Sequence, residues 1–239
     1  MQSPLKVRIR GPITVFLLAI TLPLAFGPFT GGAGASTSSV LAHAKTQLLK
    51  LSDLPSGWTA SRSDNSSASS TDPLGSAQVA SCIGVSKSVL DAKHHSVSSS
   101  NFTNSPSGGS LQVFDTIDVF STSKVLHQHH AAIERSKTPR CVQTALNGAG
   151  KAAIDKAFAP AQVFLLKARK DATANFAPAV FPLSIDWVLS EQGQSIPVSL
   201  TIVFFAKGNE EQKLGFVAIN GTFPATLSKH LTAVALGRL

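Results

Sequence analysis

A period of two between residues 181 and 204 constrains the fold more than any other feature of this sequence. Alternate positions of a first run hold Phe181, Leu183, Ile185, Trp187 and Leu189. After the turn signal Gln192-Gly193, a second run holds Ile196, Val198, Leu200, Ile202 and Phe204. Such alternation is typical of half-buried strands. The sequence therefore predicts an antiparallel hairpin with one shared buried face.

The order of the other expected elements gives the fold class. Apolar residues recur at helical spacing in segments 36–51, 75–83, 121–133 and 139–148, and in a last helix that begins at Pro224. Further strands are expected at 111–120, 163–169 and 214–220, with a weaker start at Asn101-Phe102. Segments 61–71 and 96–110 are expected as loops, and 207–213 as a polar turn. This order predicts an α+β fold in which an antiparallel sheet of about five or six strands packs with helices.

Two of these helices have a definable buried stripe. In the first helix the stripe comprises Val40, Leu41, Ala44, Leu48 and Leu51. In segment 121–133 it comprises Val125, Leu126, His129 and Ile133, after a cap supplied within 121–123. Both helices are therefore expected to pack with one side on the sheet.

Residues 1–35 have the layout of a secretory signal peptide. Lys6, Arg8 and Arg10 precede the apolar run 13–26, and the small residues 33–35 offer a cleavage site. The alternative is an N-terminal membrane anchor, because no charged residue occurs between 11 and 44. Pro23, Gly27 and Pro28 interrupt the run and favour cleavage. We therefore expect residues 36–239 to form a single α+β extracytoplasmic domain, secreted or at the cell surface, and membrane-anchored if the leader is retained.

The charge of the chain argues against nucleic-acid binding. The formal net charge of +8 falls to +5 without the three cations of the leader. We expect this small surplus to be spread along the chain as solvated surface, with Lys167, Arg169 and Lys170 as its densest group. The alternative for these cations is contact with acidic polymers or lipid headgroups.

The two cysteines, Cys82 and Cys141, are expected to form a disulfide. An even pair in an exported protein is most simply bridged, and the spacing is not that of a redox-active Cys-x-x-Cys. The alternative is two buried free thiols. A bridge would tie two of the expected helices together.

Residues 51–58, Leu-Ser-Asp-Leu-Pro-Ser-Gly-Trp, carry a family resemblance. They are similar to the L-x-D-L-P-x-G-W opening of exported proteins of actinobacteria and related bacteria, as is the later Cys82-Ile83-Gly84. Some proteins of this kind resemble extracytoplasmic sensor domains or lipoproteins with a PsbP-like α/β/α sandwich. The resemblance implies that architecture and no catalytic residues. Trp58 is either a ligand-stacking platform or a staple that covers the first helix.

Few residues are placed for chemistry. Ser121-Thr122-Ser123-Lys124 and Ser63-Asp64-Asn65 occur in the wrong order for a penicillin-binding enzyme, and no K-T-G follows them. His127, His130 and Glu134 share a helix face and could ligate zinc, but we interpret that face as solvent-exposed. The segment 148–151 matches part of a phosphate loop but reads better as a helix end.

A dispersed pair of carboxylates remains open. The candidates are Asp115, Asp118, Asp186 and Glu191, of which Asp115 and Asp118 should point to opposite faces of a strand. The leading hypothesis is an exported non-enzymatic binding or sensor-like domain for a small apolar or cell-envelope ligand or a partner protein. The alternatives are an envelope-directed hydrolase and a purely structural or assembly protein. We expect a monomer with no catalytic residue, metal or cofactor.

Overall fold

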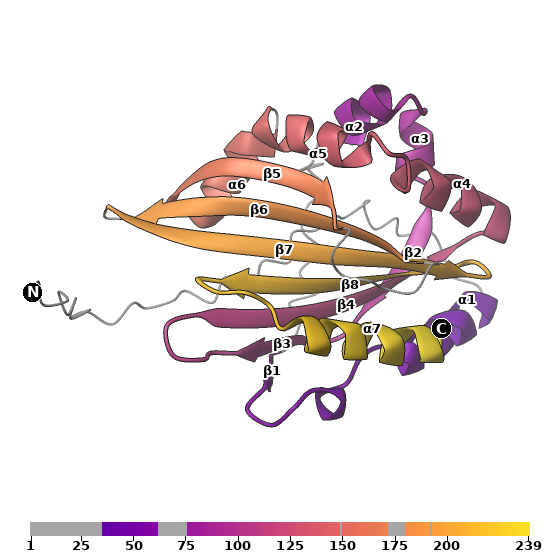
Figure 1. The fold of residues 1–239 in the computed structure, drawn as a ribbon. Coiled ribbons are helices and arrows are strands. Elements are labelled where there is room, and N and C mark those ends of the chain that lie inside the picture. Colours follow the sequence, from indigo (N-terminus) through magenta and orange to yellow (C-terminus); the bar gives the residue numbers. More distant parts are fainter. Residues whose placement is uncertain (1–34, 62–75, 149, 172–179, 192) are drawn as a thin grey trace, which may run out of the picture.

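One antiparallel sheet organises the computed structural model, which describes residues 35–61, 76–148, 150–171, 180–191 and 193–239 (Figure 1). Its eight described strands follow the order β1-β3-β4-β8-β7-β6-β5, and β2 pairs with β4 beside β3. The strands are β1 (Thr59–Ser61), β2 (His94–Ser98), β3 (Asn101–Asn104), β4 (Ser110–Phe120), β5 (Gln162–Lys170), β6 (Phe181–Glu191), β7 (Gln194–Lys207) and β8 (Glu210–Ile219).

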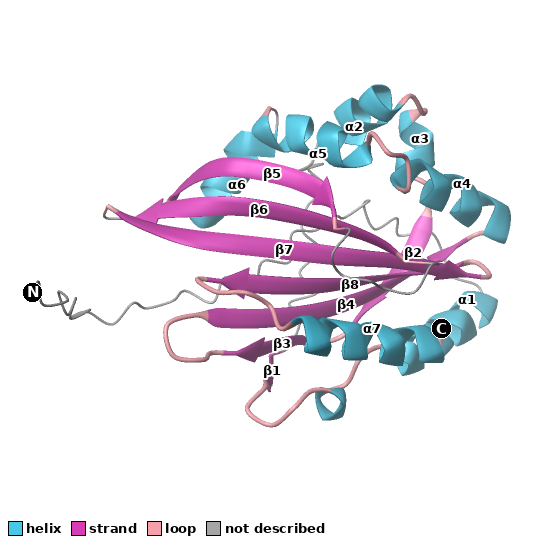
Figure 2. Ribbon diagram, in the orientation of Figure 1, coloured by secondary structure: helices cyan, strands magenta, loops and turns pink. Residues whose placement is uncertain are grey.

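Helices cover the sheet on both faces, which makes an α/β/α sandwich (Figure 2). The five-helix face carries α2 (Ser76–Ile83), α3 (Lys87–Leu90), α4 (Ser123–Ile133), α5 (Thr138–Asn147) and α6 (Gly150–Phe158). The two-helix face carries α1 (Ala35–Gln47) and α7 (Ala225–Arg238), and a 3-10 turn, η1 (Leu51–Asp53), follows α1. The predicted α+β class and layering are therefore confirmed. The expected leader falls, apart from Ala35, outside the described residues.

The β6–β7 hairpin agrees with the alternation in the sequence. Phe181 pairs with Phe204, and Trp187 pairs with Val198. Opposed residues of antiparallel strands project from the same face, so both apolar sets point toward the five-helix face. There they join the main core with Leu146 of α5 and Ile83 of α2.

The sheet has more strands than the five or six expected, because polar segments also pair. β2 lies in sequence that contains two histidines and two serines, and part of it was expected as loop. The expected polar turn 207–213 is also wrong beyond its first residues, since β8 begins at Glu210 and pairs with both β4 and β7. Glu211, Gln212 and Lys213 are buried. Contacts with residues distant in sequence therefore override the local polar pattern.

The first helix ends one turn earlier than its apolar stripe suggests. α1 stops at Gln47, and the chain then turns into η1. Ala44 and Leu48 are buried as expected, but Leu51 is 42% exposed because it lies beyond the helix. No helix among the described residues is long and apolar enough to cross a bilayer.

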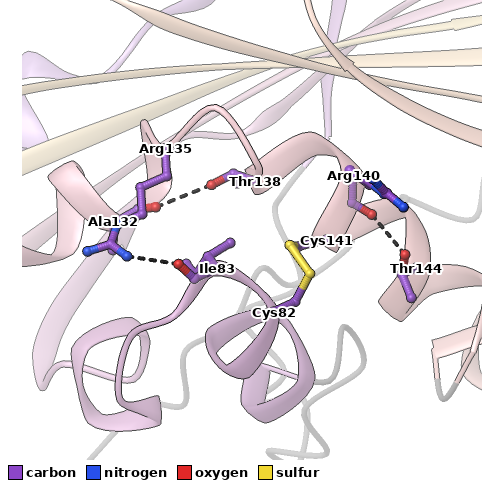
Figure 3. Close-up of a disulfide and its surroundings, with 8 residues drawn as sticks. All are labelled: Cys82, Ile83, Ala132, Arg135, Thr138, Arg140, Cys141 and Thr144. Atoms are coloured by element: carbon purple, nitrogen blue, oxygen red, sulfur yellow. Dashed lines mark hydrogen bonds between the residues drawn. A yellow bond between two sulfur atoms is a disulfide. The ribbon is translucent and has the colours of Figure 1, made fainter.

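A disulfide joins Cys82 of α2 to Cys141 of α5, as expected (Figure 3). The same region carries a second link between helices, in which Arg135 Nη1 donates to Ile83 O at 2.8 Å. Thr138 Oγ1 at the start of α5 donates to Ala132 O in α4 at 3.2 Å. The covalent bond and these hydrogen bonds hold α2, α4 and α5 together as one layer.

Removal of the disulfide should destabilise the protein without changing its fold. The bridge spans 59 residues, and closing a loop of this length contributes about 4 kcal/mol in the chain-entropy model. The double variant Cys82→Ala/Cys141→Ala should lower the free energy of unfolding in urea by roughly this amount. Equal stability of the variant and the oxidised wild type would contradict the assignment. Alkylation of the unreduced wild type, followed by mass measurement, checks that the bridge is present.

Candidate functional site

A group of buried ionisable side chains lies on the five-helix face where β4, β8 and α4 meet. We call it the buried charge cluster; its members are His94, Asp118, His129, His130, Glu211 and Lys213. Asp118 of β4 is opposite Glu211 of β8, and Ser96 of β2 is opposite Asp118. The strand register thus aims the cluster's sheet residues toward α4, which supplies the two adjacent histidines.

Glu211 anchors α4 to the sheet. Its Oε1 lies 2.7 Å from His130 Nδ1, and its Oε2 lies 3.2 Å from His129 Nδ1. The Glu211 side chain has no exposed surface. His130 also reaches outward, since its Nε2 lies 3.4 Å from Oε1 of the half-exposed Glu134. The cluster therefore connects the sheet to the surface through His130.

Asp118 holds the β2 side of the cluster. Its Oδ1 accepts a hydrogen bond from Ser96 Oγ at 2.6 Å, and its Oδ2 forms an ion pair with Lys213 Nζ. His94 Nε2 lies 3.6 Å from the same Oδ2, while His94 Nδ1 is 2.7 Å from Ala92 O. A carbonyl oxygen can only accept, so His94 Nδ1 carries the proton.

One aromatic ring separates the two halves of the cluster. The ring of Phe120 lies 5.2 Å from that of His94 and 5.0 Å from that of His129, measured between centroids. This ring is buried and excludes water from both imidazoles. Low local dielectric strengthens the paired charges and raises the cost of unpairing them.

The pKa values follow from burial and pairing. Burial alone would raise the pKa of Glu211, but hydrogen bonds from His129 and His130, with the charge of Lys213, lower it to about 2. Burial opposes protonation of His130, yet the hydrogen bond and charge of Glu211 outweigh burial and raise its pKa. Burial lowers the pKa of His94 despite the charge of Asp118. Glu211 and His130 therefore form an ion pair near neutral pH.

A third buried carboxylate, that of Asp115, points to the two-helix face. Asp115 Oδ2 accepts from Leu49 N at 2.8 Å, and both of its oxygens lie 2.8 Å from Gln212 Nε2. Burial raises the pKa of Asp115 to about 6, against these hydrogen bonds. Asp115 and Asp118 thus point to opposite faces, as their spacing predicts, and each binds its own partners.

The L-x-D-L-P-x-G-W segment is fixed by the C-terminal helix. Asp53 accepts two hydrogen bonds of 2.7 Å from Arg238 of α7, and Arg238 Nη1 also donates to Leu48 O at 3.1 Å. Trp58 is 7% exposed and lies in an apolar cluster, with its ring 6.2 Å from that of Phe223. This placement accounts for Trp58 by packing, and its use as a ligand platform stays a prediction.

The residues predicted as possible zinc ligands, His127, His130 and Glu134, differ in how far they are buried. His127 is exposed, whereas His130 is largely buried on Glu211, so the interpretation of this helix side as solvent-facing is wrong for His130. In the part of the chain that the structure describes, no group of three or more His, Cys, Asp or Glu side chains could hold a metal ion. Sequence reasoning missed the contact between α4 and Glu211. The signal that could have indicated it was the run of four polar residues that opens β8.

The other motif candidates have structural explanations. Thr122 Oγ1 caps α4 by accepting from Val125 N at 3.2 Å, and Ser63-Asp64-Asn65 lies outside the described residues. Gly148 ends α5, and Lys151 pairs with Asp155 in α6. Asp186 pairs with Arg169 across β5 and β6, while Glu191 is exposed at the end of β6.

Positive charge gathers at the β5 edge of the sheet and on the helices packed against it. Residues 137–170 contain seven Lys or Arg and one Asp, a formal charge of +6 in a chain of +8. Their elements α5, α6 and β5 contact one another at one edge of the molecule (Figure 1). We call this the basic edge; its cations are Lys137, Arg140, Lys151, Lys156, Lys167, Arg169 and Lys170. All are exposed except Lys151, which is half-buried.

The basic edge corrects the expectation that the charge surplus is spread along the chain. Its cations come from one continuous stretch of the chain, and the three consecutive elements of this stretch also pack on one another. With the three cations of the leader set aside, the rest of the chain is close to neutral. The basic edge also contains Phe164, which is 47% exposed and is one of three exposed large apolar residues among the described ones. We therefore take the basic edge as the candidate binding surface.

Comparison with known proteins gives one structural match. No family model and no curated protein matches the chain. A solved structure described as LpqN, involved in cell envelope biogenesis of Mycobacterium tuberculosis, aligns at 10% identity with a TM-score of 0.30. The alignment covers 56% of this chain and 65% of that one. A superposition this loose supports no inference about function.

Glu211→Gln should destabilise the protein strongly. The substitution removes the buried negative charge that pairs with His130 and attracts Lys213, and removing one partner of a buried ion pair costs about 3 to 5 kcal/mol. The control Glu134→Gln removes the partly exposed partner of His130 and should cost under about 1 kcal/mol. Urea unfolding at pH 7 measures both. Similar losses for the two variants would show that Glu211 does not anchor α4.

Asp115 should make the protein more stable in mild acid. Its folded pKa of about 6 lies above the ordinary value of 3.8, so the folded state binds the proton more tightly than the unfolded state. The contribution of Asp115 to stability is therefore greatest below pH 3.8 and falls by about 3 kcal/mol as pH rises through 6. Asp115→Asn should remove this part of the decline.

Urea unfolding of both proteins between pH 4.5 and 7.5 measures this contribution as the difference between the two curves. Asp91→Asn is the matched control, because Asp91 pairs with Lys87 at the surface. A difference between wild type and Asp115→Asn that does not change with pH would contradict the prediction.

Proposed function

We propose that this protein is an exported, non-enzymatic binding domain that attaches to a component of the cell envelope through its basic edge. The observation that carries this proposal is the concentration of exposed cations on α5, α6 and β5, together with an exposed Phe164 on β5. Exposed charge of one sign on one surface is typical of proteins that bind a partner of the opposite sign.

Export is supported by two independent features. The leader-like sequence of residues 1–35 suits secretion. The Cys82–Cys141 disulfide suits an oxidising compartment, where such bonds persist. A domain in that compartment meets the acidic polymers and lipids of the envelope, which complement a basic surface.

The non-enzymatic part of the proposal is supported by how the buried carboxylates are used. Glu211 and Asp118 are engaged by α4, Ser96 and Lys213, and Asp115 is engaged by Leu49 and Gln212. These contacts join secondary-structure elements to one another. Asp115 and Asp118, two of the candidates for a dispersed hydrolytic site, are thus used to hold the fold together.

Binding should depend on Phe164. The full chain is mixed with bacterial envelope material separated into membrane vesicles and insoluble wall, and the bound fraction is measured by sedimentation. Phe164→Asp should lower binding to the preferred fraction about tenfold, because it removes apolar contact area and adds a repelling charge. Leu51→Asp is the matched control, since Leu51 is 42% exposed but lies on η1, and it should bind as wild type does.

Two outcomes would overturn this proposal. One is that wild type and Phe164→Asp bind both fractions equally weakly. The other is robust turnover in a screen of ester, glycoside and peptide substrates, abolished by one Ser, Asp or His substitution. The second outcome would favour the hydrolase.

A further inference from the structure

The composition of the basic edge indicates what kind of surface it fits. β5 is the last strand of the sheet, so its side chains lie at the rim of the molecule. Lys167 pairs in register with Asp186, and Arg169 forms an ion pair with the same Asp186. Lys151 pairs with Asp155. Even with Asp155, Asp171 and Asp186 counted against its seven cations, the edge keeps a formal charge of +4.

The edge is closed to strand addition. β5 has a register irregularity between Phe164 and Lys167. Gln143 of α5 uses its Oε1 to accept from Ala168 N at 3.1 Å, which occupies a backbone donor of this strand. Bulges, charged side chains and such caps prevent another strand from pairing at an edge. The partner therefore contacts side chains rather than extending the sheet.

Apolar side chains lie beside Lys167 and Arg169, on the face of β5 turned away from α5 and α6. Phe164 is opposite Val188 of β6, and Val188 is opposite Pro197 of β7, so the three form a row on one face of the sheet. Phe164 and Pro197 are exposed and Val188 is half-buried. An aromatic ring beside lysines and arginines is typical of protein surfaces that rest at a membrane interface.

We infer that the basic edge docks on an anionic lipid bilayer, with Phe164 in the headgroup region and the cations on its side of β5, Lys167 and Arg169, on lipid phosphates. This inference rests on the proposed envelope-binding function and names the partner. A soluble acidic polymer would satisfy the cations but leave Phe164 and Pro197 in water. A bilayer satisfies both, so the exposed apolar row favours the lipid.

The number of cations that face the membrane determines how strongly a substitution should change the partition constant. Each Lys or Arg held near an anionic membrane raises the partition constant about fivefold. Reversal of one cation to Glu therefore lowers it about 25-fold if that residue faces the membrane. Because exposed charges are screened over about 10 Å at 0.1 M salt, binding should weaken as salt rises.

The test uses vesicles of phosphatidylcholine alone and vesicles with 30% phosphatidylglycerol, sedimented with the full chain. The measured quantity is the ratio of partition constants between the two vesicles, with the leader identical in every protein. Lys167→Glu should lower this ratio about 25-fold. Lys124→Glu is the matched control, because Lys124 is exposed on α4, and it should change the ratio less than twofold.

A site-specific reporter separates docking from general charge attraction. The emission of Phe164→Trp should shift to the blue when anionic vesicles are added, whereas Leu51→Trp should not respond. Equal losses for Lys167→Glu and Lys124→Glu, or no shift for Phe164→Trp, would overturn the inference. Soluble polyglutamate can be used to displace wild type and Phe164→Ser from the vesicles. If the same concentration displaces both proteins, Phe164 makes no contribution and the edge is assigned to an acidic polymer.

The two proposals fail in different ways. If the protein sediments with insoluble wall in a Phe164-dependent manner but not with anionic vesicles, the envelope-binding function stands and the lipid inference falls. If it binds neither vesicles nor either envelope fraction, both proposals fall.

Discussion

The register between β4 and β8 is the constraint on which the rest of the structure depends. It places Asp118 opposite Glu211 and Ile117 opposite Gln212. Because side chains alternate between faces, this single alignment sends Asp118, Glu211 and Lys213 toward α4, and Asp115 and Gln212 toward α1 and α7. If the register shifted by one residue, the side chains of the shifted strand would change faces. Its buried charged groups would then point to the wrong helices. The polar contacts therefore specify the register as firmly as apolar packing does.

Each helical layer is attached to these two strands by polar groups. On the five-helix face, His129 and His130 of α4 hold Glu211, and the disulfide fixes α2 to α5 in the same layer. On the two-helix face, Asp115 holds the chain just after α1, and Arg238 of α7 joins Asp53. Burial of ionic groups is costly unless they are fully paired, so both layers gain a defined position at the expense of some stability.

The sequence predicted those elements whose pattern is local. The β6–β7 hairpin followed from strict alternation, and α2, α4 and α5 followed from helical spacing and caps. The opening of β8 was missed because four polar residues resemble a turn, and their partners Asp118 and His130 lie far away in sequence. The charge of the basic edge was readable from residues 137–170, whereas the packing of α5 and α6 on β5, which brings these cations to one edge, was not.

The charged residues of this protein thus fall into two groups with different physical behaviour. Those near β4 and β8 are buried and paired, so salt screens them much less than exposed charges, and they fix the positions of the helices on the sheet. Those of the basic edge are exposed and largely unpaired, so they contribute little to folding and remain available to a partner. Unpaired cations repel one another, which costs the folded protein some stability. Their concentration at the β5 edge, together with an exposed phenylalanine, has no counterpart in the needs of the fold, which supports the proposed binding role.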